Sequence, residues 1–128
     1  MTLDSSALIA ILFAEPGYLD LVDRILQSDH VRMGAPTLVE TSLVFMGRHG
    51  GRNTESVEGL LKELGVSVVP FGEAESRVAT DAFRRYGRGR HAAALNYGDC
   101  LAYATAKVAR DTLLFVGDDF SKTDIQAA

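Results

Sequence analysis

Several acidic residues stand where a carboxylate could do chemistry, and Glu40 is the most conspicuous of them. It is the only charged residue between Arg32 and Arg48. A carboxylate on a largely apolar helix loses solvation unless a polar partner, a metal ion or water lies beside it. The alternative is that Glu40 lies on a narrow solvated edge of that helix together with Thr37 and Thr41.

The other candidate carboxylates are Asp4, Asp99, Asp118 and Asp119. Asp4 follows the short apolar start of the chain, and Asp118 and Asp119 follow an apolar run at residues 113–116. Asp4 could instead cap a helix, and Asp99 could complete a capping box with Asn96. Capping and metal binding are compatible, because a carboxylate has two oxygens.

Taken together, these acids predict a metal site. Four like charges brought to one place cannot all stay ionised without a cation. Carboxylate oxygens are hard ligands that suit Mg²⁺ or Mn²⁺. The chemistry that fits is metal-assisted hydrolysis of a phosphodiester, in which the metal activates a water and neutralises charge on the phosphate.

The hydrophobic pattern predicts the elements that must position these acids. Strands are expected at residues 1–3, 30–33, 66–69 and 112–116. Helices are expected at residues 7–14, 19–26, 36–46, 54–64, 73–86 and 96–110. Strands separated by helices imply right-handed crossovers and a three-layer α/β domain with a central, mostly parallel sheet. Ligands bind such sheets beyond the carboxyl ends of the strands, which is where Asp4, Asp118 and Asp119 are expected.

Length and composition fit a single domain over residues 1–128. The chain has a net charge of −4, 47% hydrophobic residues and 23% charged residues, which is typical of a globular protein. A single cysteine, Cys100, excludes an internal disulfide and a cysteine-based zinc site, and suits a reducing cytoplasm. No apolar stretch approaches the roughly 20 residues of a membrane helix, so no membrane association is expected.

The motifs resemble those of a known family. They are Leu3-Asp4-Ser5-Ser6-Ala7-Leu8, the helix of Glu40, the segment from Tyr86 to Cys100, and the ending from Leu114 to Ile125. They look like PIN-domain nucleases, and more closely like VapC toxins of bacterial type II toxin–antitoxin systems. The resemblance covers nearly the whole chain. Its most specific parts are the segment from Gly87 to Cys100 and the Gly-Asp-Asp-Phe ending.

The resemblance implies a Mg²⁺-dependent endoribonuclease, with Mn²⁺ as a substitute, that cleaves cellular RNA and arrests growth. The family's first three acids match Asp4, Glu40 and Asp99. We favour Asp118 as the fourth acid and keep the adjacent Asp119 as a second candidate. Asp4 and Asp99 would bind the metal directly, whereas Glu40 and Asp118 would hold waters or a second metal. The RNA target, whether transfer, ribosomal or messenger RNA, is left open.

The resemblance also implies partners. A VapB-type antitoxin would neutralise the toxin, with a basic side chain entering the carboxylate cluster, in a toxin–antitoxin hetero-oligomer. We also expect a homodimer. The early helices carry more apolar residues than one buried stripe requires, so we expect them to supply a partner or dimer surface. These residues are Leu8, Ile11, Leu12, Phe13, Leu19 and Leu21.

Further residues have predicted supporting roles. Ser6 and Thr37 could orient a carboxylate or a water, or could simply cap helices. Residues 77–91 carry five arginines and one acid, and the last two arginines, Arg88 and Arg90, stand in the loop before Asp99. We expect these two to guide the RNA backbone, with little reading of bases. The alternative is a solvated helix face with a basic end.

Other functions were weighed against this one. A haloacid-dehalogenase-type phosphatase needs Asp-x-Asp after the first strand, but this chain has Asp4-Ser5-Ser6. A receiver domain needs an acceptor Asp after a central strand and a Lys after a later one, and neither arrangement is convincing. The main alternative is a catalytically silent PIN-like module that binds RNA or protein. All four acidic positions of the family are filled in this chain, which argues against a silent module.

Overall fold

A four-stranded parallel sheet organises the described part of the chain. The structure is a computed structural model of the 128 residues, and it describes residues 1–49 and 55–128. The strands are β1 (Thr2–Leu3), β2 (Val31–Gly34), β3 (Val66–Val69) and β4 (Leu113–Leu114). They pair in the order β3-β2-β1-β4, and every pairing is parallel. The predicted parallel α/β sheet is therefore confirmed.

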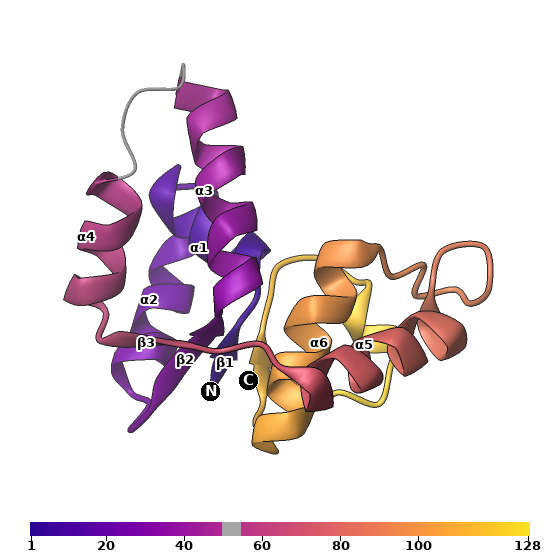
Figure 1. The fold of residues 1–128 in the computed structure, drawn as a ribbon. Helices are drawn as coiled ribbons and strands as arrows, with labels where there is room; N and C mark the ends of the chain where they lie inside the picture. Colours follow the sequence, from indigo (N-terminus) through magenta and orange to yellow (C-terminus); the bar gives the residue numbers. More distant parts are fainter. Residues whose placement is uncertain (50–54) are drawn as a thin grey trace.

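Helices cover the sheet on both sides (Figure 1). They are α1 (Ser5–Leu12), α2 (Tyr18–Leu26), α3 (Ala35–His49), α4 (Glu55–Glu63), α5 (Glu73–Tyr86) and α6 (Tyr97–Ala109), and a 3₁₀ turn, η1 (Phe120–Lys122), follows β4. No helix in residues 1–49 or 55–128 is long and apolar enough to span a membrane. The predicted helices are all present; α5 has the expected bounds and the others have shifted ends. For α4, residue 54 of the expected range lies outside the described residues.

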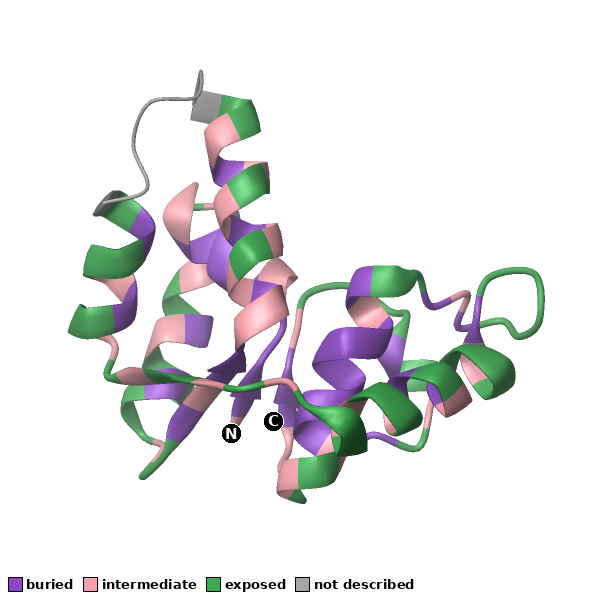
Figure 2. Cartoon of the chain, viewed as in Figure 1, coloured by how far each residue is buried: buried purple, intermediate pink, exposed green. Residues whose placement is uncertain are grey.

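Consecutive residues of a strand face opposite layers, and β4 shows this directly. Leu114 belongs to a core that contains residues of α1 to α4, whereas Leu113 belongs to a second core with α5 and α6. Figure 2 shows the buried residues on the sheet and on the helix faces that look toward it. The sheet is thus the middle of three layers, as predicted.

β4 is shorter than the predicted strand, which extended to Val116. Beyond Leu114, the backbone N–H of Val116 donates to the Ser6 hydroxyl (3.0 Å) rather than to a neighbouring strand. The chain therefore leaves the sheet two residues early and turns toward the start of α1.

The apolar early helices serve mainly the core. Leu8, Ile11 and Leu21 are buried, and Leu12 and Phe13 are packed against the same core. Only Leu19 of the expected surface residues is largely exposed, at 63%. The excess of apolar residues arises because α1 is surrounded on most sides by α2, α3 and α4. Most of these side chains are therefore unavailable to a partner.

Candidate active site

The carboxyl ends of the central strands bring the predicted acids together. Asp4 directly follows β1, and its backbone N–H donates to the carbonyl of Leu114 in β4 (2.9 Å). β2 runs without a loop into α3, whose second turn carries Glu40. Asp99 lies in the first turn of α6, which packs against both β1 and β2. Separate elements therefore converge on the edge of the sheet where ligands were expected.

Asp4 is buried, with 3% of its surface exposed, and caps α1. Its Oδ2 accepts hydrogen bonds from the backbone N–H (3.0 Å) and the hydroxyl (2.5 Å) of Ser6. Its Oδ1 is buried and has no hydrogen-bond partner. Leaving a buried carboxylate oxygen unpaired is costly, so this atom marks a place where a ligand would be stabilised.

The Ser6 hydroxyl connects Asp4 to the chain that follows β4. It donates to Asp4 Oδ2 and accepts from the backbone N–H of Val116. The hydroxyl hydrogen therefore points to the carboxylate, which fixes the orientation of the Asp4 side chain. Thr37, the other residue predicted to orient a carboxylate or a water, is fully buried, and its Oγ1 has no hydrogen-bond partner.

Glu40 lies directly against the start of α6. A Cβ added to Gly98 would overlap the Glu40 carboxyl group, so only glycine at this position allows the carboxylate to lie there. Gly98 was not among the site residues expected from the sequence. The available signal was a glycine in the first turn of a helix, immediately before an acid.

Asp99 is held by the predicted capping box. Its Oδ2 accepts from the backbone N–H of Asn96 (2.7 Å), while Asn96 Oδ1 accepts from the backbone N–H of Asp99 (3.0 Å). This arrangement fixes the side chain and leaves the other carboxylate oxygen for a ligand.

The charges of these acids act on one another. Burial raises the pKa of Asp4, and the charge of Asp99 raises it further, against the hydrogen bonds from Ser6. Burial also raises the pKa of Glu40, with added repulsion from Asp4 and Asp99 and an opposing hydrogen bond from Ser5. The three carboxylates therefore form one electrostatic unit, in which each opposes the ionisation of its neighbours.

The fourth member of this unit comes from the segment after β4. Burial raises the pKa of Asp99, the backbone N–H of Asn96 opposes this, and the charge of Asp119 raises it further. Asp118 and Asp119 are both exposed, and the carbonyl of Asp118 accepts from the Ser121 hydroxyl (2.6 Å). Asp119, the second candidate expected from the sequence, is thus the one whose charge raises the pKa of Asp99. We call Asp4, Glu40, Asp99 and Asp119 the acidic site.

The two predicted arginines lie on the loop between α5 and α6, and the charge of Arg88 acts on the acidic site. Both are exposed. The charge of Arg88 lowers the pKa of Asp99, the opposite of the effect of burial. The guanidinium of Arg90 lies over the ring of Phe83, 5.6 Å from its centroid. Positive charge therefore lies beside the carboxylates, as an anionic polymer entering the site would require.

The acidic site fits a hydrated divalent ion. No group of three or more His, Cys, Asp or Glu side chains in the described residues is arranged to hold a metal ion directly. Mg²⁺, however, is commonly bound through one or two carboxylates and keeps several waters. Asp4 offers an unpaired buried oxygen, and the surrounding donors are carboxylates and hydroxyls, which are hard ligands.

Known proteins share this fold and much of this sequence. The PIN domain family matches residues 1–126. Ribonuclease VapC36 of Mycobacterium tuberculosis is 42% identical over 127 residues, which cover 98% of this chain and 91% of the relative. Ribonuclease VapC of Mycolicibacterium smegmatis is 41% identical over 128 residues, which cover 99% and 98%.

A solved structure agrees with the fold. The crystal structure of Mycobacterium tuberculosis VapC20, described as a sarcin-ricin loop cleaving toxin, superposes with a TM-score of 0.74. The match covers 99% of this chain and 97% of that one, at 16% sequence identity. At this identity the likeness concerns the fold.

The burial of Asp4 predicts a gain in stability when its charge is removed. Asp4→Asn keeps an oxygen that accepts from Ser6 and should raise the melting temperature by several degrees at neutral pH in EDTA. Because folding raises the pKa of Asp4, the ionised carboxylate destabilises the folded chain. This effect is absent below the pKa of the unfolded chain, near 3.8, and complete above the pKa of the folded chain. The gain should therefore grow as pH rises through this window, as thermal unfolding across a pH series would show.

Asp81→Asn is the matched control. Asp81 is a partly exposed acid of α5 that accepts hydrogen bonds from Arg84 (3.0 and 2.6 Å), so its replacement should give no gain. Added Mg²⁺ should stabilise the unmodified chain more than Asp4→Asn. Equal melting temperatures for Asp4→Asn and the unmodified chain at every pH would contradict the assignment.

Proposed function

The chain belongs to the PIN-domain family and, within it, to the VapC ribonucleases, and from this membership we propose that it is a Mg²⁺-dependent endoribonuclease toxin that cleaves cellular RNA. The observation that carries the proposal is the convergence of Asp4, Glu40, Asp99 and Asp119, with a buried, unpaired oxygen on Asp4. Four coupled carboxylates oppose each other's ionisation, so they suit a cation and the polyanion it helps to cleave.

In this proposal Asp4 and Asp99 hold the ion directly, and Glu40 and Asp119 act through waters or hold a second ion. Mn²⁺ can replace Mg²⁺, because both prefer oxygen ligands. A bound ion would activate water and neutralise developing charge on the phosphate. Asp118 is the alternative to Asp119.

The remaining residues orient the acids for the reaction. Ser6 fixes the Asp4 carboxylate by its hydroxyl, and Asn96 fixes Asp99 by its backbone N–H. Gly98 leaves room for Glu40 beside the start of α6. Because burial raises the pKa of Glu40, this carboxylate is a suitable acceptor for the proton of the attacking water.

RNA is the substrate class in this proposal, and Arg88 and Arg90 guide its backbone. Both arginines are exposed, the charge of Arg88 acts on Asp99, and phosphate contacts of this kind give affinity without reading bases. An RNA substrate would be met in the cytoplasm.

Protein partners complete the proposal. We assign neutralisation to a VapB-type antitoxin whose basic side chain pairs with the acidic site, in a hetero-oligomer built on a homodimer. The apolar face formed by Val39 and Leu43 of α3 and Tyr97 of α6 supports the homodimer. These side chains are 57%, 59% and 79% exposed and line a hollow of about 390 Å³ beside Glu40.

The purified chain should cleave total cellular RNA at discrete positions with Mg²⁺ and not with EDTA. Asp4→Asn and Asp99→Asn should each reduce the rate on the order of a hundredfold or more, since both remove direct ligands. Asp119→Asn should reduce it more than Asp118→Asn. Gel analysis of the RNA and primer extension would measure these effects.

The control is again Asp81→Asn, which should cleave normally. Cleavage that survives EDTA and all three Asn substitutions at the acidic site would contradict the proposal. Unchanged RNA in every lane, from folded protein that still binds RNA, would favour the catalytically silent binding module instead.

Removing the guiding arginines should weaken RNA binding in a salt-dependent way. Arg88→Ala and Arg90→Ala, on an Asp4→Asn background that keeps RNA intact, should each lower the slope of log K against log salt by about 0.7. Fluorescence anisotropy with a labelled single-stranded oligonucleotide measures this slope. Arg77→Ala, which removes an exposed arginine paired with Glu73, is the control and should leave the slope unchanged.

Leu43→Glu should convert the homodimer to monomer, because it places a charge in the proposed apolar interface. Leu19→Glu, at an equally exposed leucine of α2, should not. Light scattering coupled to size-exclusion chromatography distinguishes the two forms. A monomer produced by Leu19→Glu alone would instead place the interface on the early helices.

A further inference from the structure

The segment that carries Asp119 has little regular structure to hold it. Between β4 and the C-terminal residues it contains only the short η1 turn. Its far end is anchored by Leu113, whose N–H donates to Gln126 and whose carbonyl accepts from Ala128. Near Asp119, the buried ring of Phe120 packs against Phe115, with centroids 5.0 Å apart. Apolar contact of this kind does not by itself fix the direction of a neighbouring carboxylate.

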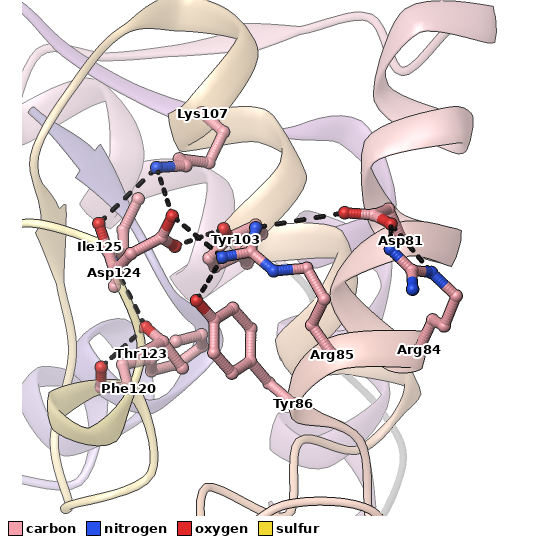
Figure 3. A network of polar contacts seen from close by, with 10 residues as sticks. All are labelled: Asp81, Arg84, Arg85, Tyr86, Tyr103, Lys107, Phe120, Thr123, Asp124 and Ile125. Atoms are coloured by element: carbon pink, nitrogen blue, oxygen red, sulfur yellow. Dashed lines mark hydrogen bonds and ion pairs between the residues drawn. The ribbon is translucent and has the colours of Figure 1, made fainter.

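A polar network fastens the same segment to α5 and α6 (Figure 3). Asp124 Oδ1 accepts from the hydroxyl of Tyr103 (2.5 Å). Asp124 Oδ2 lies 3.3 Å from both Arg85 Nη2 and Lys107 Nζ. The carbonyl of Asp124 also accepts from Lys107 (3.4 Å). One side chain of the segment thus contacts two helices.

The bond to Tyr103 is the dominant part of this network. Arg85, Lys107 and Asp124 all have partly exposed side chains, and ion pairs of this kind contribute little. Tyr103 is 1% exposed, and a hydrogen bond to an ionised acceptor is among the stronger ones. Partial burial acts against ionisation of Asp124, but the Tyr103 bond and the nearby cations hold its pKa at about 2.

Helix geometry relates this bond to the acidic site. Asp99, Tyr103 and Lys107 are spaced four residues apart on α6, so they lie on one face of the helix. Asp119 acts on Asp99 at the start of this face, and Asp124 bonds to Tyr103 one turn further along. Along this face the segment is repelled at Asp99 and attracted at Tyr103 and Lys107.

We propose that the Tyr103–Asp124 hydrogen bond is a clamp that holds Asp119 beside Asp99 against the repulsion between their charges. Tyr103 and Asp124 are positioning residues, because they act on the metal site only through Asp119. The role of the clamp in metal binding rests on the proposed metal-dependent function. Whether the hydrogen bond holds the segment in place can be tested without metal.

The metal-free test is amide hydrogen exchange followed by mass spectrometry. Tyr103→Phe removes only the hydroxyl and should speed exchange on the order of tenfold in residues 115–125, while α1 to α3 stay as protected as before. Asp124→Ala should do the same. Asp81→Ala is the control, because it removes another carboxylate near Arg85 (3.9 Å) without touching the segment.

The second test is Mn²⁺ binding measured by electron paramagnetic resonance. Tyr103→Phe should weaken Mn²⁺ binding on the order of tenfold, as loss of an orienting partner does, and should have no further effect on an Asp119→Asn background. Unchanged exchange in both variants, or an equal loss of Mn²⁺ affinity with and without Asp119, would overturn the clamp. Failure of the unmodified chain to bind Mn²⁺ would overturn the proposed function and the role of the clamp in metal binding. The hydrogen-exchange result would still decide whether the hydrogen bond holds the segment.

Discussion

Repulsion between carboxylates held at one edge of the sheet is the constraint on which the rest of the structure depends. Asp4, Glu40 and Asp99 are wholly or partly buried. The charge of Asp99 raises the pKa of Asp4, the charges of Asp4 and Asp99 raise that of Glu40, and the charge of Asp119 raises that of Asp99. Nothing in the apolar core favours such an arrangement. It persists because the core on both faces of the sheet supplies enough stability to hold the elements that carry these acids.

The supporting contacts share one property: each fixes a carboxylate from outside the acidic site. Ser6 holds Asp4 while also bonding the chain after β4, so one hydroxyl sets two components of the site at once. The capping box holds Asp99, and Gly98 accommodates Glu40. These neighbours keep the repelling groups in place so that binding of a cation needs little rearrangement of the protein.

Local patterns in the sequence predicted much of this arrangement. The alternation of strands and helices was enough for the parallel three-layer fold. The Asn96–Asp99 capping box was recognisable because its two residues are only three positions apart. The contact between Glu40 and Gly98 was not recognisable, since it joins two residues more than fifty positions apart in the chain. The use of α1 in the core was also missed, because periodicity shows how apolar a helix is and not how many neighbours surround it.

The sequence by itself determined the elements, the acid at the end of β1, the lone carboxylate of α3 and the acid at the start of α6, because these follow from short-range pattern and helix capping. Only the tertiary structure brought Asp119 close enough to Asp99 for its charge to raise the pKa of Asp99. Adjacent residues of a turn point in different directions, and their surroundings depend on how the segment packs against α6. The bond between Tyr103 and Asp124 joins residues far apart in the chain, so it exists only once the C-terminal segment packs against that helix.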